Sequence, residues 1–229
     1  MKEGPDISRI AALIGDPARA NMLNALMDKR ARTAGELAEE AGVTKQTASS
    51  HLSQLLGADL LHRDVQGRHH YYRLAGRDVA AALEALMTLA DVGAGRRLRA
   101  GPKDPAMRKA RACYDHLAGE LGVLMFDQMM TGGWIGTKAN ALSVSTLGWQ
   151  RLKAIGIDPE HVPRSRRPQC RTCLDWSMRR YHLAGSIGSA VLDQIYAQGW
   201  ARRDTASRAV LFTANGEARF RRWLDGAGR

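Results

Sequence analysis

The feature that most limits the fold of this chain is an internal duplication in its second half. Residues 116–134, HLAGELGVLMFDQMMTGGW, align without a gap to residues 182–200, HLAGSIGSAVLDQIYAQGW, and nine of the nineteen positions are identical. Two copies of a unit are too few for a solenoid. The duplication therefore predicts one compact domain with pseudo-twofold symmetry and a seam between its two halves.

Each copy is predicted to be an α-β-β-α repeat, over about residues 112–158 and 174–226. A long helix is followed by a short strand after a Gly-Trp pair, then by a second strand and a closing helix. Small residues in the long helices suggest that these two helices pack closely. The glycines expected to face each other across that contact are Gly119, Gly122, Gly185 and Gly188.

The seam between the repeats is a candidate pocket for a neutral organic effector, since such seams often hold small molecules. Large apolar side chains from both copies are expected to line it: Met125, Met129, Trp134 and Trp200. The same side chains would equally fill a solid core, with the two tryptophans at helix-to-strand corners. Both interpretations stay open on the sequence.

Cysteines are the residues of the second half with soft-ligand or redox chemistry. Cys113, Cys170 and Cys173 are too few and odd in number for a disulfide framework, and they are expected to stay reduced in the cytoplasm. Three thiolates could bind one soft ion, whereas a tetrahedral zinc site would recruit His116 and His182. A metal ion at the cysteines is thus a candidate cofactor.

Two alternatives to a metal site remain for these residues. Arginines near Cys170 and Cys173 would lower a thiol pKa and favour oxidation, which makes a thiol-based redox sensor the second hypothesis. Cysteines are also often inert and buried. His116 and His182, repeated with glycines on the expected helices, are interpreted as packing or capping residues ahead of ligands.

The first half has the signature of a winged helix-turn-helix. Helix starts are expected at Asp6, at Asp16-Pro17, at a capping box from Thr33 to Glu36 and at Thr44. The short turn of residues 42–44 separates two of these helices. Two strand-like runs, ADLLHRDV and HHYYRLA, follow and meet at residues 66–68, before a last helix over residues 77–93.

Three segments, GDPARANMLNAL, TKQTASSHLSQLLGADLL and QGRHHYYRL, resemble the ArsR/SmtB-type winged-helix repressors over about residues 7–92. The resemblance implies a homodimeric bacterial repressor that binds double-stranded operator DNA and leaves it on meeting an inducer. The terminal helices of this domain would form the dimer interface. The residues that the resemblance places on DNA are Lys45, Gln46, Thr47, Ser49, Ser50, His51 and Arg68.

Both metal sites familiar from that family are missing here. The stretch GELAEEAG has no Cys-x-Cys pair, and residues 76–92 contain no histidine. The inducer is therefore expected to be sensed in or near the C-terminal domain. The rival function is an architectural DNA-binding protein that senses nothing.

The basic excess of the chain lies in its second half. Residues 1–95 carry 11 Lys and Arg against 12 Asp and Glu, whereas residues 96–229 carry 23 against 11. We expect a DNA-binding and dimerisation domain at 1–92, a basic linker at 93–105 and an effector or oligomerisation domain at 106–229. The basic second half is predicted to add phosphate contacts.

The sequence disfavours a membrane-spanning protein, a secreted protein and an enzyme. No run of apolar residues is long enough to cross a membrane, and the N-terminus does not look like a secretory signal. Residues 106–229 lack the phosphate-loop, dinucleotide, zinc-protease and nucleophile-elbow motifs, so an enzyme is not expected. The sequence predicts a mainly α, α+β, cytoplasmic transcriptional regulator.

Overall fold

The computed structural model of the protein describes residues 4–67, 69–93, 102, 104–138, 141–162 and 168–226. The chain divides into two compact units, Met1–Leu86 (unit 1) and Met87–Arg229 (unit 2), and the division falls within one helix. Most of the predicted basic linker lies outside the described residues. Among the helices that the structure describes, none combines the length and apolarity needed to cross a membrane.

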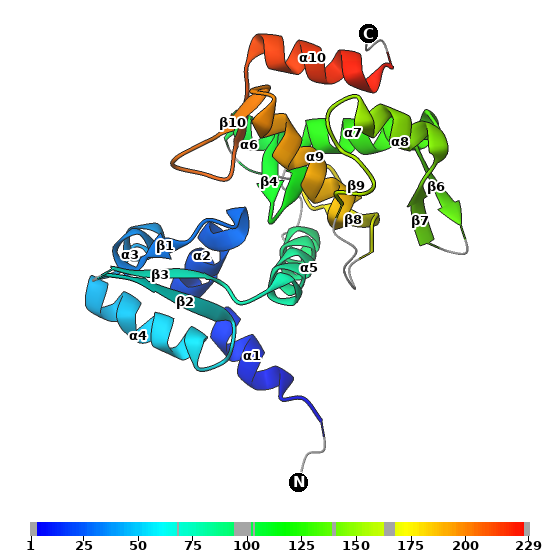
Figure 1. The fold of residues 1–229 in the computed structure, drawn as a ribbon. Helices are drawn as coiled ribbons and strands as arrows, with labels where there is room; N and C mark the ends of the chain where they lie inside the picture. The colour runs from blue at the N-terminus through cyan, green and yellow to red at the C-terminus, as the bar shows by residue number, and fades with distance from the viewer. Residues whose placement is uncertain are drawn as a thin grey trace. The chain divides into compact units, whose positions relative to one another are not determined.

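Unit 1 is a helical domain with a small antiparallel sheet (Figure 1). Its elements are α1 (Ile7–Ile14), α2 (Pro17–Ala25), the 3-10 helix η1 (Leu26–Asp28), β1 (Arg32–Thr33), α3 (Ala34–Ala41), α4 (Lys45–Leu56), β2 (Leu61–Gln66), β3 (His69–Leu74) and α5 (Arg77–Gly93). Helix α5 continues across the division between the two units.

The predicted helix starts of unit 1 are confirmed by their caps. The side chains of Asp6, Asp16 and Thr44 each accept a backbone N–H at the start of their helix. Thr33 and Glu36 form the predicted capping box at the start of α3. Because these caps satisfy N–H groups that a helix cannot pair internally, they fix where each helix begins.

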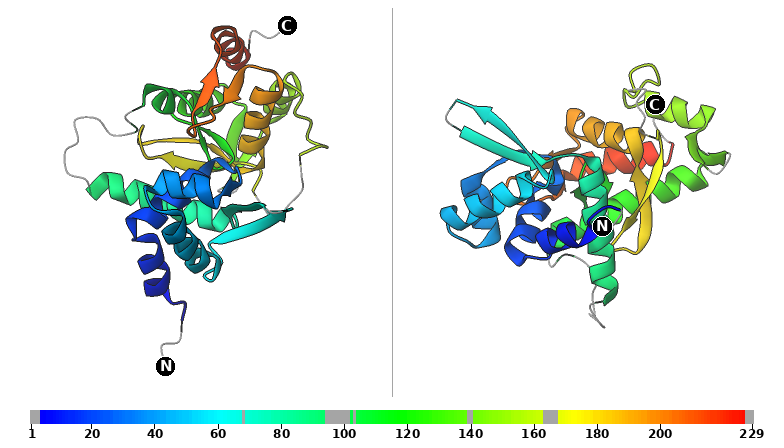
Figure 2. Two further views of the ribbon diagram at one scale, coloured as in Figure 1. Left: turned by 90° about the vertical axis from the view of Figure 1, so that its left-hand side faces the viewer. Right: turned by 90° about the horizontal axis from the view of Figure 1, so that it is seen from below.

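The sheet of unit 1 has the strand order β1-β3-β2, and β2 pairs with β3 from Leu61↔Leu74 to Gln66↔His69. This register makes β2 and β3 the predicted wing, which extends as a two-stranded arm (Figure 2, cyan). Gly67 has a φ of 58°, as the tight connection of such a hairpin requires. Arg68, the predicted DNA contact at the tip, lies outside the described residues.

Unit 2 is built from five helices and four two-stranded sheets among its described residues after α5. They are α6 (Pro105–Lys109), β4 (Arg111–Cys113), β5 (His116–Ala118), α7 (Glu120–Thr131), β6 (Ile135–Lys138), β7 (Ala141–Val144), α8 (Thr146–Lys153), β8 (Arg171–Asp175), β9 (Arg180–Ala184), α9 (Gly185–Ala197), β10 (Ala201–Arg203), β11 (Val210–Phe212) and α10 (Ala214–Leu224).

The predicted α-β-β-α repeat is present twice, and the α+β class is confirmed. A β-hairpin that was not predicted from the sequence precedes each long helix, β4–β5 in the first repeat and β8–β9 in the second. Histidines 116 and 182 therefore lie on strands, not on the helices where they were expected. The identical HLA segments end these hairpins, and the helices begin only after them.

The sequence predicted that Gly119 and Gly122 face Gly185 and Gly188 across a contact between two helices. The structure shows a different arrangement. Gly119 and Gly185 have φ values of 81° and 95°, a conformation that allows the chain to turn from strand into helix. A side chain at Gly122 would collide with the carbonyl of Leu117, and one at Gly188 with the carbonyl of Leu183. These glycines let each helix pack directly on the strand before it.

One hydrophobic core joins the two repeats of unit 2. Helix α7 contacts β9 and helix α9 contacts β5, so each repeat packs its long helix on the hairpin of the other. Figure 1 shows α10 on the other side of α7 and α9 from the β8–β9 hairpin. The residues proposed to line a pocket at the seam, Met125, Met129, Trp134 and Trp200, are all buried in this core.

Candidate metal centre and DNA-binding face

The predicted recognition helix α4 presents a continuous polar face. Ala48, Leu52 and Leu55 are buried in unit 1, and this anchors one side of the helix. The other side exposes Lys45, Gln46, Thr47, Ser49 and Ser50. Side chains of these types donate or accept hydrogen bonds, which is what contacts to base edges and phosphates require.

His51 differs from the other predicted DNA contacts. Its half-buried ring places Nδ1 3.2 Å from Nη1 of Arg19, and the same guanidinium donates to Oε1 of Gln54 at 2.8 Å. Arg19 also donates from Nε to the carbonyl of Leu13. His51 thus helps to join α4 to α2, and its side chain is less exposed than the other predicted DNA contacts on α4.

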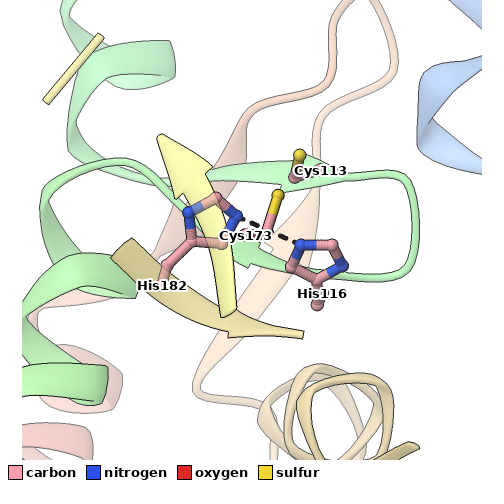
Figure 3. Close-up of side chains that lie close together, drawn as sticks. All are labelled: Cys113, His116, Cys173 and His182. Atoms are coloured by element: carbon pink, nitrogen blue, oxygen red, sulfur yellow. Dashed lines mark hydrogen bonds between the residues drawn. The ribbon is translucent and has the colours of Figure 1, made fainter. Parts of the chain in front are cut away.

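A second group of side chains gathers in unit 2. One ligand atom from each of Cys113, His116, Cys173 and His182 lies within 4.8 Å of the other three, and all four residues are buried. We call this group the Cys/His cluster (Figure 3). The Nε2 atoms of the two histidines face each other at 3.1 Å. Two thiols and two imidazoles are the donor set of many tetrahedral zinc sites.

The strand register explains how these four residues meet. Cys113 pairs with His116 across the β4–β5 hairpin, and Cys173 pairs with His182 across the β8–β9 hairpin. Side chains paired across two strands point to the same face of the sheet. Strands β5 and β9 contact each other, so each repeat delivers one cysteine and one histidine to a shared centre.

Each histidine has a carboxylate behind it. Nδ1 of His116 donates to Oδ1 of Asp115 at 3.1 Å. Nδ1 of His182 lies 3.8 Å from Oδ2 of Asp175 and has no hydrogen-bond partner within the described part of the chain. Both carboxylates are buried and come from the same position in the two repeats, two residues after the cysteine.

The surroundings separate the cysteines chemically. Cys113 hydrogen-bonds to Cys173 and, together with the two imidazoles, holds the pKa of the Cys173 thiol well below its ordinary value despite burial. Burial in the hydrophobic core instead raises the pKa of Cys170 to about 12. None of the three cysteines forms a disulfide. The structure thus places Cys170 outside the Cys/His cluster and His182 inside it.

Desolvation lowers the pKa of His182, which keeps its imidazole neutral. For Asp175, burial raises the pKa, but the Arg111 guanidinium and the backbone N–H of Gly119 hold it below its ordinary value. A neutral imidazole can coordinate a metal ion through one nitrogen, and an ionised carboxylate can accept a hydrogen bond from the N–H of the other nitrogen.

His182 was a candidate ligand from the sequence, whereas the roles of Asp115 and Asp175 were not predicted. The signal for them was present, because each repeat contains a Cys-x-Asp sequence before its histidine: Cys113-Tyr-Asp115 and Cys173-Leu-Asp175. Six additional residues in the second hairpin separate Asp175 from His182, and they hide this similarity from an alignment without gaps.

Comparisons with known proteins agree with the fold of unit 1. Residues 14–64 match the model of a family described as a helix-turn-helix domain. An uncharacterized HTH-type transcriptional regulator, YdfF of Bacillus subtilis (strain 168), is 38% identical over 221 residues, which are 96% of this chain and 98% of the relative. The HTH-type transcriptional regulator CmtR of Mycobacterium tuberculosis (strain ATCC 25618 / H37Rv) is 36% identical over 81 residues, 35% of this chain and 68% of the relative.

Among solved structures, the homodimeric winged helix-turn-helix domain of Mb0332 from Mycobacterium bovis, described as a possible ArsR-family regulator, is 26% identical. The superposition covers 40% of this chain and 91% of the Mb0332 chain, with a TM-score of 0.35. The fold of unit 1 defines a DNA-binding protein of the winged helix-turn-helix class, and the predicted resemblance is confirmed. The chain belongs to the family of HTH-type transcriptional regulators that includes YdfF, in agreement with the transcriptional regulator that the sequence predicts.

Proposed function

We propose that this regulator is a cytoplasmic repressor that binds operator DNA as a homodimer and is released when an inducer acts on the Cys/His cluster. The observation that carries the proposal is the convergence of Cys113, His116, Cys173 and His182 in unit 2. The inducer either adds a metal ion to this cluster or oxidises its thiols. Both chemistries use the same buried residues.

The support for operator binding is the exposed face of α4. Lys45, Gln46, Thr47, Ser49 and Ser50 point away from the core of unit 1, and the β2–β3 wing follows directly in the chain. In winged helix-turn-helix proteins, such a helix enters the major groove, and a wing contacts the neighbouring backbone. His51 is left out of the proposed face because it is held by Arg19. Arg68 at the tip remains a proposed phosphate contact.

The support for a dimer is apolar surface on α1 and α5. Ile7 is 76% exposed, Leu86 is 43% exposed and Leu89 is 67% exposed. No residue of α1 is buried, although its sequence is strongly amphipathic. Because exposed apolar faces on helices commonly mark association sites, a second copy of the chain is the proposed occupant. Leu86→Glu with Leu89→Glu should then yield a monomer in analytical ultracentrifugation.

The neutral organic effector loses support from the packing of unit 2. Met125, Met129, Trp134 and Trp200 would have to line its pocket, yet each is at most 4% exposed within the hydrophobic core. Opening a cavity there would remove these side chains from close packing, at a large cost in free energy. The Cys/His cluster needs no such rearrangement.

Operator release by metal ions and by oxidants, measured with the full chain in gel-shift assays, tests the proposal. The variant Cys113→Ser/Cys173→Ser should bind the operator but no longer respond to an inducer that releases the wild type. Cys170→Ser is the matched control, because it removes a buried thiol outside the cluster and should respond normally. Normal induction of the double variant would contradict the proposal. Operator affinity unchanged by every metal and oxidant would favour the architectural DNA-binding protein.

A further inference from the structure

We propose that the Cys/His cluster is a closed tetrahedral site for a divalent ion of the zinc class, held jointly by the two repeats and oriented by Asp115 and Asp175. This proposal rests on the proposed function for its role in regulation, but the site itself is argued from geometry alone. It selects metal binding over thiol oxidation as the chemistry of the cluster.

The positions of the donor atoms fit a tetrahedron. With zinc–nitrogen bonds near 2.0–2.1 Å, two nitrogen ligands stand about 3.3 Å apart. The Nε2 atoms of His116 and His182 are 3.1 Å apart. With zinc–sulfur bonds near 2.3 Å, two sulfur ligands stand about 3.8 Å apart. Since all four ligand atoms lie within 4.8 Å of one another, small side-chain rotations suffice to complete the coordination.

The hydrogen bonding of the two imidazoles points to the same conclusion. If the neutral ring of His116 donates from Nδ1 to Asp115, its Nε2 has a lone pair that can accept from Nε2 of His182. The proton of His182 is then on Nε2, and its buried Nδ1 has no hydrogen-bond partner among the described residues, 3.8 Å from Oδ2 of Asp175. Burying a ring nitrogen without a hydrogen-bond partner costs free energy.

An ion at the centre of the cluster would resolve this mismatch. Both Nε2 atoms would present lone pairs to the ion. The proton of His182 would reside on Nδ1, and this N–H could donate a hydrogen bond to the carboxylate of Asp175. Each histidine would then be backed by a carboxylate, the arrangement found around metal-ligating histidines in general. Asp115 and Asp175 are thus positioning residues, because they orient the ligands without touching the ion.

The donor set also selects the ion. Two thiolates and two neutral imidazoles disfavour Mg²⁺ and Ca²⁺, which prefer oxygen ligands. Four protein ligands in a tetrahedron are typical of Zn²⁺ sites that keep no position open for substrate. Since Cys113, Cys173 and His182 are at most 7% exposed, the site has the closed character of this type.

Occupancy would join parts of the chain that are far apart in sequence. The ligands come from strands β4 and β5 of one repeat and β8 and β9 of the other. An ion that binds the folded state and not the unfolded one adds its binding free energy to stability. We therefore expect the thermal midpoint of unfolding to rise when the ion is added to the metal-free protein.

Cobalt(II) titration of the full chain, stripped of metal and kept reduced, tests the site directly. Tetrahedral Co²⁺ gives strong visible d–d bands, and each thiolate ligand adds a sulfur-to-metal charge-transfer band. The wild type should bind one Co²⁺ per chain with both features, and one equivalent of Zn²⁺ should abolish them. Cys113→Ser and Cys173→Ser should each lose about half of the charge-transfer intensity, and Cys170→Ser should keep all of it.

The positioning role of Asp115 is tested by variants that change the affinity for Co²⁺ but leave the Co²⁺ absorption spectrum unchanged. Asp115→Asn should keep the tetrahedral bands but weaken metal affinity about 10–100-fold, the usual effect of altering such a carboxylate. Asp115→Glu should recover part of the loss. Circular dichroism checks that each variant is folded before titration.

Three results would overturn the site: no Co²⁺ bound by the folded, reduced wild type, an octahedral Co²⁺ spectrum, or unchanged charge-transfer bands in Cys113→Ser and Cys173→Ser. The same samples separate this inference from the proposed function. If Co²⁺ binds tetrahedrally but does not change operator affinity, the metal site is supported and its role in regulation is refuted. If only oxidants release the operator and no metal binds, the regulatory role of the cluster is supported and the metal site is refuted.

Discussion

Arg111 and Asp175 form an ion pair inside unit 2, with Nη2 2.7 Å from Oδ1 and the two side chains 1% and 0% exposed. Arg111 starts strand β4 of the first repeat, and Asp175 ends strand β8 of the second. The other carboxylate oxygen of Asp175 accepts the backbone N–H of Gly119 at 2.7 Å, where α7 begins. One carboxylate therefore connects both hairpins to the first long helix, directly behind His182.

Arg111→Met should destabilise the protein strongly. It leaves the Asp175 carboxylate buried without its cation, which in other proteins costs about 3–5 kcal/mol. Chemical denaturation measures the free energy of unfolding. The matched control is Arg180→Met, which removes an ion pair between Arg180 and Asp127 whose side chains are 59% and 37% exposed. That change should cost at most about 1 kcal/mol. Equal losses in the two variants would show that Arg111 contributes no more than a surface arginine.

Gln46→Ala and Ser50→Ala should reduce the discrimination between operator and unrelated DNA. Each good contact to a base edge contributes about 1–3 kcal/mol of selectivity, so each variant should lose about 5–150-fold. Fluorescence anisotropy with operator and scrambled DNA gives the ratio of the two affinities. Thr33→Ala is the control, because it weakens the cap of α3 without touching the proposed surface. A ratio unchanged by both α4 variants would mean that this face does not read the sequence.

Most of unit 1 could be predicted because its signals are local. Asp16 before Pro17, and Thr33 three residues before Glu36, fix helix starts through bonds within one turn. The wing follows from two adjacent apolar runs around a glycine. What could not be predicted is the role of His51, since its contact with Arg19 spans 32 residues and depends on how α4 packs on α2.

The Cys/His cluster was harder to predict because its members meet only through tertiary structure. Cys170 and Cys173 are close in sequence, and this spacing suggested a shared site. Within strand β8 and the residue before it, however, the chain sends Cys170 into the hydrophobic core and Cys173 toward His182. The short hairpins went unrecognised because strands of three to five residues carry no clear periodicity. Cross-strand register, which brings each cysteine beside its histidine, cannot be read from such segments.

Replacing exposed arginines of unit 2 should reduce the salt dependence of DNA binding. Arg202, Arg219 and Arg222 are exposed on β10 and α10, in the half of the chain that carries the basic excess. Each DNA phosphate that an arginine no longer neutralises makes the slope of log affinity against log salt shallower by about 0.9. The triple Arg→Gln variant should show a shallower slope than the wild type. Asp193→Asn, which alters an exposed charge of the opposite sign on α9, should not. An identical slope for all three proteins would exclude these arginines from the DNA interface.

Cys170 and Cys173 should differ in their reaction with iodoacetamide, although both are buried. The thiolate is the nucleophile, so a thiol whose pKa is raised to about 12 stays protonated and unreactive near neutral pH. The lowered pKa of Cys173 keeps it ionised under the same conditions, and local opening of its hairpin then permits alkylation. Peptide mapping by mass spectrometry over time should show Cys173 modified first and Cys170 only on unfolding.

Denaturant supplies the control for this comparison, because the two cysteines should react at similar rates once the chain is unfolded. Zn²⁺ added to the folded, metal-free protein should slow the modification of Cys173 and leave Cys170 unaffected, since a coordinated thiolate is no longer available as a nucleophile. Modification of Cys170 at the rate of Cys173 in the folded chain would contradict the burial of Cys170 in the core. Modification of Cys173 at one rate with and without Zn²⁺ would argue that this thiol is not a ligand.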